Sequence, residues 1–255
     1  MSLICSLCII SCGDDLDLPD YLALHVENCL HYNGMNQIAV VSPFEEEFLV
    51  SVFGGDEDYE VTCEDSRVEL IKKDQYSYLA RIEHLGNDTV TIHIKDHSQL
   101  YTRLFITMKY PVITYKVSKY LAVIEGENIT VGDKKKMEEE IQRFLSEKMD
   151  GKYVFTYTNK ELSGGLVRIE SGKTVEEGTF SSIPMQAGDV SYSQITIQTD
   201  KETCVYDFRT DVYTNQDFYL STRFVEDVTD KYKEKYPGFE KAYAIQGVWK
   251  TTSDY

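Results

Sequence analysis

The stretch Phe48-Leu49-Val50-Ser51-Val52-Phe53-Gly54-Gly55 decides the fold of the first half of this chain. Large apolar residues stand at alternate positions, which is the period of a half-buried β-strand. The two glycines that follow predict a turn, because glycine adopts backbone conformations that other residues avoid. A second apolar stretch begins at Tyr59. The pattern therefore predicts two short strands joined by a tight turn.

The same pattern repeats from Met35 to Met108. Turn-forming residues interrupt the apolar stretches about every 8–12 residues, which is the spacing of an immunoglobulin (Ig)-like β-sandwich. A composition with 19 Tyr residues also favours strands. The expected strands cover residues 38–41, 48–53, 59–63, 68–71, 76–82, 89–94 and 104–108.

A short motif in this region points to a group of domains. Gly86 is followed by Val90 and Ile92, so that a glycine turn leads into an alternating strand. With the stretches at 48–55 and 59–61, it resembles the bacterial Ig-like (BIG-type) domains. The resemblance implies an Ig-like β-sandwich over residues 34–110. The Cys…Trp…Cys hallmark of Ig domains is absent, as is common in the bacterial group.

The second half, residues 111–255, combines strands with helices. Met137, Ile141 and Leu145 recur at helical spacing after Asp133, a good N-cap, and Asp150-Gly151 ends this first helix. A second helix is expected from about Ser221 to Tyr236, because its apolar residues fall on one helical face. The expected strands cover residues 112–117, 120–124, 153–157, 165–170, 177–180, 192–199, 203–209 and 243–249. We therefore expect an α+β domain, with two helices on an antiparallel sheet.

The first twelve residues indicate export. An apolar run ends at Ile9-Ile10-Ser11-Cys12, which resembles the lipobox of a bacterial lipoprotein signal. The resemblance implies that residues 1–12 are the signal with a lipidated Cys12, and residues 13–33 are expected to form a tether and lead-in strand. Because residues 1–11 contain no Lys or Arg, this interpretation needs a basic region upstream of Met1. The alternative is a buried N-terminal strand.

Two further resemblances concern location. The acidic run Asp14, Asp15 and Asp17 resembles the surface-export signal of Bacteroidetes lipoproteins, although a solvated linker would look the same. Stretches such as Gly178-Thr179-Phe180 resemble the C-terminal domain of Bacteroides surface lipoproteins. Together they imply a surface-exposed protein, lipid-anchored in the outer membrane. They imply no activity.

Charge and cysteine content exclude several classes of protein. The formal net charge of −17 disfavours nucleic-acid binding, which needs a basic face. Beyond Cys12 the chain has Cys29, Cys63 and Cys204, and no CxxC spacing. An odd number at long spacings argues against a disulfide framework or a zinc ribbon. We expect no cofactor.

Few residues suggest a metal site. His93 and His97 have metal-ligand spacing on a helix, but on a strand they lie about 13 Å apart, so we expect two surface histidines. The run Asp56-Glu57-Asp58 offers oxygen ligands for Ca²⁺, but it lacks EF-hand spacing, so a solvated turn is expected. No metal site is therefore predicted.

Two other acidic motifs concern modification and catalysis. Asp88-Thr89-Val90 resembles the O-glycosylation signal of Bacteroides-type bacteria, which makes Thr89 a candidate modification site. Glu226 and Asp227 are expected on the exposed face of the second helix, where a catalytic carboxylate pair would lack the burial it needs.

The leading hypothesis is a surface lipoprotein that binds a glycan, a host protein or an envelope partner. The Ig-like domain would be a spacer and the second domain the binding end. One alternative is an accessory glycan-degrading hydrolase, since two-carboxylate chemistry leaves no sequence signature. Another is a subunit of a larger surface assembly. A tyrosine-lined groove would favour the binding module, and a deep pocket with converging carboxylates would favour the hydrolase.

Overall fold

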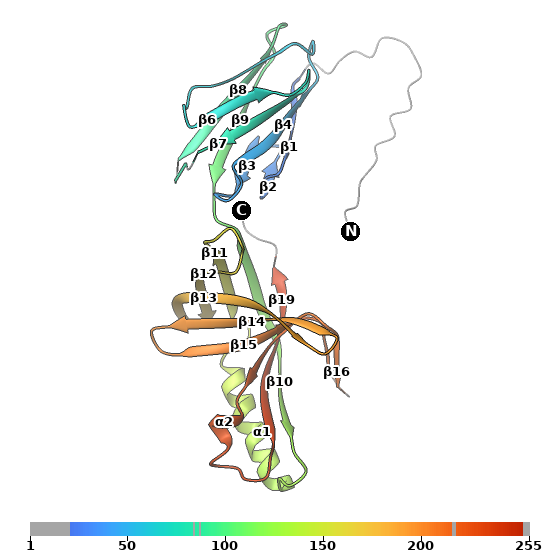
Figure 1. Ribbon diagram of the computed structural model, residues 1–255, viewed down its shortest axis with the longest axis vertical. Helices are drawn as coiled ribbons and strands as arrows, with labels where there is room; N and C mark the ends of the chain where they lie inside the picture. Colours follow the sequence, from blue (N-terminus) through green and yellow to red (C-terminus); the bar gives the residue numbers. More distant parts are fainter. Residues whose placement is uncertain (1–20, 84, 87, 216–217, 252–255) are drawn as a thin grey trace, which may run out of the picture. The chain divides into compact units, whose positions relative to one another are not determined.

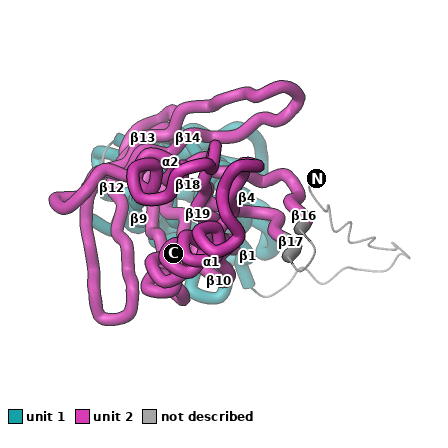
Figure 2. Tube along the Cα trace, turned by 90° about the horizontal axis from the view of Figure 1, so that it is seen from below, with its two compact units in different colours: residues 1–109 teal, residues 110–255 magenta. Residues whose placement is uncertain are grey.

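The computed structural model describes residues 21–83, 85–86, 88–215 and 218–251 (Figure 1). Cys12 and the acidic run after it lie outside the described residues. The described chain is mainly β, as expected, and it divides into two compact units, Met1–Lys109 and Tyr110–Tyr255 (Figure 2). Within those described ranges, the structure contains no helix with the length and apolar character needed to cross a membrane.

Unit 1 consists of two sheets that share one apolar core. The first has the order β1 (Ala23–Glu27), β4 (Glu47–Phe53), β7 (Ser77–Ile82) and β6 (Val68–Lys72). The second has the order β2 (His31–Asn33), β3 (Ile38–Val41), β9 (Tyr101–Met108), β8 (Thr89–Asp96) and β5 (Tyr59–Cys63). All neighbours are antiparallel except β3 and β9. The seven strands expected from the sequence are present.

The core of unit 1 follows from the alternation in its strands. Phe48, Val50 and Val52 of β4 are buried, and they pack in one cluster with Ile92 and Ile94 of β8. The alternating positions of β4 are thus the inward-facing ones. Burial of such side chains stabilises a fold by about 1.5–3 kcal/mol each.

A tether and lead-in strand were expected over residues 13–33, and the described part contains two strands that belong to the sheets of unit 1. Residues 23–27 form β1, which pairs antiparallel with β4 and buries Leu24 and Val26 in the core. Residues 31–33 form β2, which pairs with β3. The alternating apolar pattern of β1 is only five residues long. Its hydrogen-bonding partner, β4, begins some 20 residues later in the chain.

Unit 2 is a closed barrel of eight antiparallel strands. The order is β10 (Val112–Glu125), β11 (Lys152–Tyr157), β12 (Gly164–Ser171), β13 (Thr174–Ala187), β14 (Val190–Thr199), β15 (Thr203–Arg209), β18 (Arg223–Asp227) and β19 (Lys241–Thr251). Helix α1 (Val131–Ser146) follows β10, and the hairpin of β16 (Tyr213–Asn215) and β17 (Phe218–Leu220) follows β15. The antiparallel sheet expected here is present, but it is a closed barrel, because β19 pairs with both β18 and β10 and closes the sheet on itself.

The second expected helix is also wrong in its first part. Arg223–Asp227 is strand β18, and only Thr229–Tyr232 is helical (α2). Phe224, Val228 and Tyr232 are buried, but this spacing fits a strand followed by a helical turn as well as one helix. Pairing of β18 with β15 and β19 decides between the two.

Helix α1 forms largely as expected. Met137, Ile141 and Leu145 are buried and pack toward β10 and β19. The N-cap is Thr130 and not Asp133: the Thr130 Oγ1 accepts a hydrogen bond from the Asp133 N–H at 3.1 Å. Thr130 Oγ1 also donates to the Asp133 carboxylate at 2.9 Å. Both residues therefore stabilise the first turn.

Aromatic rings fill the interior of the barrel. Tyr153, Phe155, Phe180, Tyr206 and Phe224 are each 5% exposed or less and belong to one cluster. Beyond this cluster, the inner faces of β10 and β19 pack against the buried side chains of α1. Since the interior is packed, a ligand site in this unit has to lie elsewhere, and the outer face of the barrel offers one.

Candidate ligand groove

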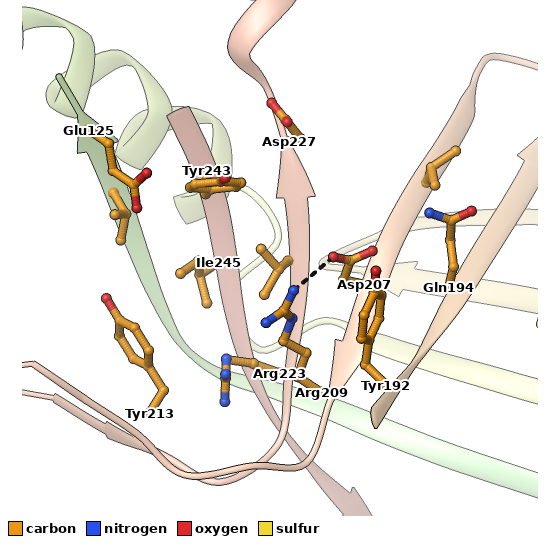
Figure 3. A pocket seen from close by; sticks show the side chains of 13 residues that line it. Glu125, Tyr192, Gln194, Asp207, Arg209, Tyr213, Arg223, Asp227, Tyr243 and Ile245 are labelled. Carbon is orange, nitrogen blue, oxygen red and sulfur yellow. Dashed lines mark hydrogen bonds and ion pairs between the residues drawn. The ribbon is translucent and has the colours of Figure 1, made fainter. Parts of the chain in front are cut away.

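A groove of about 540 Å³ lies on the outer face of β10, β14, β15, β18 and β19 (Figure 3). Side chains alternate between the two faces of a strand. In β18, Phe224 therefore points into the barrel core, while Arg223, Val225 and Asp227 line the groove. This surface is called the groove below.

Strand register brings the lining residues into rows that cross the sheet. Gln194 of β14 is opposite Asp207, which is opposite Val225, which in turn is opposite Ile245 of β19. In the same way Arg209 is opposite Arg223. Residues far apart in the sequence thus meet on one surface.

The groove has an apolar floor and tyrosine sides. Val225 and Ile245 form the floor, and the β16–β17 hairpin covers the adjoining part of this face through Leu220. Tyr213 and Tyr192 lie on opposite sides of the two arginines, and Tyr243 lies beside Ile245 (Figure 3). Three phenol rings therefore surround one apolar patch.

Both arginines of the groove are held by carboxylates and by rings. Arg209 donates to the Asp207 carboxylate at 3.2 Å, and its guanidinium lies 4.7 Å from the centre of the Tyr192 ring. Arg223 is 3% exposed and donates to the carboxylate and the carbonyl oxygen of Asp211 at 2.9 and 2.5 Å. Its guanidinium lies 5.2 Å from the centre of the Tyr213 ring. Each positive charge thus has a negative partner.

Carboxylates mark the other end of the groove, at Glu125 and Asp227 (Figure 3). Burial acts to raise the pKa of Asp227, but hydrogen bonds from Thr229 and Lys241 outweigh it and hold the pKa below its ordinary value. Asp227 is therefore an ionised acceptor and a poor general acid. Burial and the charge of Glu125 raise the pKa of Tyr243, so this phenol remains neutral and can donate.

Glu226 does not join the groove. The sequence placed it on an exposed helix face, but it lies on β18 beside the core residue Phe224 and points the other way from Asp227. Burial raises the pKa of Glu226. Since the two carboxyl groups face opposite sides of the sheet, they cannot act as a catalytic pair on one substrate.

Polar groups near Glu226 form an inner cluster. The Tyr153 hydroxyl donates to Gln246 Oε1 at 3.0 Å, and Lys148 Nζ donates to the Tyr206 hydroxyl at 3.4 Å. Four buried polar atoms of the described residues have no hydrogen-bond partner: Gln246 Nε2 and Glu226 Oε2 in this cluster, and Arg209 Nε and Asp211 Oδ1 at the groove arginines. This cluster belongs to the barrel interior and is separate from the groove.

The histidines and the acidic turn have structural partners. His93 Nδ1 lies 2.6 Å from the Tyr101 hydroxyl, and the backbone N–H of His97 donates to the Asp56 carboxylate at 3.2 Å. Asp56 also accepts a hydrogen bond from the Asp58 N–H. In the part of the chain that the structure describes, no group of three His, Cys, Asp or Glu side chains could hold a metal ion.

The remaining sequence candidates do not line the groove. Thr89 is exposed at the start of β8, and Asp88 beside it pairs with Arg67 at 2.9 Å. Glycosylation of Thr89 stays a prediction. Cys29, Cys63 and Cys204 are free thiols.

Comparisons with known proteins give no family. No protein-family model matches the chain, and no curated protein matches it. Among solved structures, the S-layer protein SbsC, domains 5–6, is 9% identical over 72% of this chain and 95% of that chain, with a TM-score of 0.24. Likeness at this level carries no argument about fold or function.

Proposed function

We propose that this protein is a binding module whose second unit takes an uncharged, polyhydroxylated ligand, a glycan, in the groove. One observation carries the proposal. The groove combines three tyrosines and an apolar floor with arginines that carboxylates already neutralise. Its volume of about 540 Å³ lies within the range of small-molecule sites.

The chemistry of a sugar suits this surface. A pyranose ring has apolar C–H faces, against which phenol rings pack, and a rim of hydroxyl groups that both donate and accept. Paired guanidinium and carboxylate groups present fixed donors and acceptors to such hydroxyls. An anionic ligand is disfavoured, because the groove lining carries three carboxylates, Glu125, Asp207 and Asp227, against the two guanidinium groups of Arg209 and Arg223.

The hydrolase alternative receives less support. A glycosidase needs one carboxylic acid with a raised pKa and a second carboxylate facing the same bond. In the groove, the pKa of Asp227 is lowered, and the carboxyl with a raised pKa, Glu226, faces the other side of the sheet. Groove chemistry therefore favours binding.

Calorimetric titration with neutral oligosaccharides tests the proposal. The probes are hexasaccharides of the cello, xylo, manno and malto series. At least one should bind saturably, and Tyr192→Ala and Arg209→Ala should each weaken it about tenfold, which is about 1.4 kcal/mol. Both side chains are partly exposed, so these variants should fold.

Trp249→Ala is the matched control. Trp249 is a half-exposed aromatic residue on β19 that does not line the groove, so its removal should leave binding unchanged. Failure of all four probes to bind, or equal loss in the control, would refute the groove as a glycan site. Cleavage of a bound probe would favour the hydrolase.

We further propose that the chain acts as a surface lipoprotein, with unit 1 as an Ig-like spacer. The lipobox-like stretch around Cys12 and the two-sheet core of unit 1 support this. Cys12→Ser should move the protein from membranes to the soluble fraction almost completely, since each buried CH₂ of a lipid chain contributes about 0.8 kcal/mol. Fractionation of the expressing cells measures this redistribution. If Cys12→Ser stayed in the membrane fraction as the wild type does, the lipid anchor would be refuted.

A further inference from the structure

The hairpin of β13 and β14 is longer than the barrel needs. The two strands stay paired from Gly178 opposite Thr199 to Ala187 opposite Val190. Pairing with the neighbouring strands stops earlier, at Ser181 on the β12 side and at Ser193 on the β15 side. Residues 182–192 thus form a two-stranded extension, here called the arm.

One face of the arm continues the surface of the groove. Ile183 is opposite Gln194, and Met185 is opposite Tyr192, so each pair shares a face of the hairpin. Gln194 and Tyr192 both line the groove. Ile183 and Met185 are 55% and 38% exposed, although both are large and apolar.

A second hollow of about 490 Å³ lies at the arm, mainly on its other face. Gln186, Ser191 and Phe208 line it, and they alternate with the groove-side residues and share the face of the barrel interior, against which Phe208 packs. Met185 and Tyr192 stand at its edge. The hollow therefore does not extend the groove, and only the exposed face with Ile183 and Met185 does.

Strand spacing gives the length of the combined surface. Neighbouring strands lie about 4.8 Å apart, so the path from β19 across β18, β15 and β14 to β13 is about 19 Å long. A pyranose unit advances a glycan chain by about one such spacing. The path thus matches a chain of four or five sugar units running across the strands.

We infer that the ligand is the interior or end of a glycan chain laid across the strands, from Tyr243 over Tyr192 to the apolar face of the arm. This inference rests on the proposed function. Its occupant is a neutral oligosaccharide, because the arm continues a groove whose arginine charges are already paired. Ile183 and Met185 contact only the sugar units that lie beyond Tyr192.

Titration with one homologous series, from disaccharide to hexasaccharide, tests this inference. The series is that of the hexasaccharide bound in the first experiment. Affinity should rise with each added unit up to the tetra- or pentasaccharide and then level off. In a double variant, Ile183→Ser with Met185→Ser, affinity for the hexasaccharide should fall about tenfold, while affinity for the disaccharide should stay unchanged.

Leu166→Ser is the matched control, because Leu166 is a 56% exposed apolar residue on β12 that lines neither cavity. It should bind every member of the series as the wild type does. The chain inference would be overturned if saturable binding did not depend on chain length, or if the double variant lost affinity equally for short and long ligands. Either result would leave the proposed function standing. Absence of binding at every length would overturn both.

Discussion

A chain truncated after Pro237 should lose the fold of unit 2 and keep that of unit 1. The deletion removes β19, which lies between β10 and β18 and closes the barrel. It takes away the buried side chains of Ile245 and Val248 and exposes the faces they cover. Losing several apolar residues at about 1.5–3 kcal/mol each exceeds much of the 5–15 kcal/mol that stabilises a typical domain.

Thermal unfolding measures this directly. The full chain should show a transition for each unit, and the truncated chain should keep one and lose the other. Unit 1 has its own core, which contains no residue beyond Met108. Trp249→Ala, which alters an exposed side chain of the same strand, should keep both transitions. If the truncated chain kept both as well, β19 would be dispensable and the closed barrel would be wrong.

Phe224→Ala should destabilise unit 2 by about 3–5 kcal/mol, the usual cost of deleting a buried phenyl ring. Phe224 is 1% exposed, and its ring centre lies between 5.1 and 6.2 Å from those of five other rings. These rings belong to Tyr115, Tyr153, Phe155, Tyr206 and Phe208. Few neighbours can move to fill the cavity without losing contacts of their own.

Urea unfolding of unit 2 checks the effect. Leu166→Ala is the control, because Leu166 is 56% exposed on β12 of the same unit, and surface substitutions usually change stability by less than about 0.5 kcal/mol. A midpoint for Phe224→Ala that fell no further than that of the control would contradict the packed aromatic interior.

Strand positions could be predicted because alternation leaves a local signature. In β4 the buried residues Phe48, Val50 and Val52 are every second residue. Closure of the barrel left no such signature. It depends on pairing between β10 and β19, in which Leu121 meets Ile245 more than a hundred residues later, and no local pattern encodes that contact.

The segment around β18 shows how one pattern can fit two structures. Phe224, Val228 and Tyr232 are spaced four residues apart, which is the helical period, and all three are buried. In the same segment, Arg223 and Val225 face the groove while Phe224 faces the barrel core. This alternation is the signal of a strand. Hydrogen bonding to both neighbours outweighs the helical pattern here.

The groove could not be predicted because its residues come from five barrel strands and from Tyr213 of β16, spread between Val123 and Ile245. Each barrel strand contributes two or three outward-facing side chains, and nothing local distinguishes them from a solvated face. With 19 tyrosines in the chain, Tyr192, Tyr213 and Tyr243 gave no signal of their own. Only the register of the closed sheet brings them together.

Chemical-shift mapping of the full chain with the neutral hexasaccharide that binds most tightly tests the central claim most directly. We expect perturbed backbone amides to cluster on β14, β15, β18 and β19 around Tyr192, Arg209 and Tyr243, and to continue onto the arm at Met185. Perturbations confined to unit 1, or to the α1 side of the barrel around Lys148 and Gln246, would contradict it.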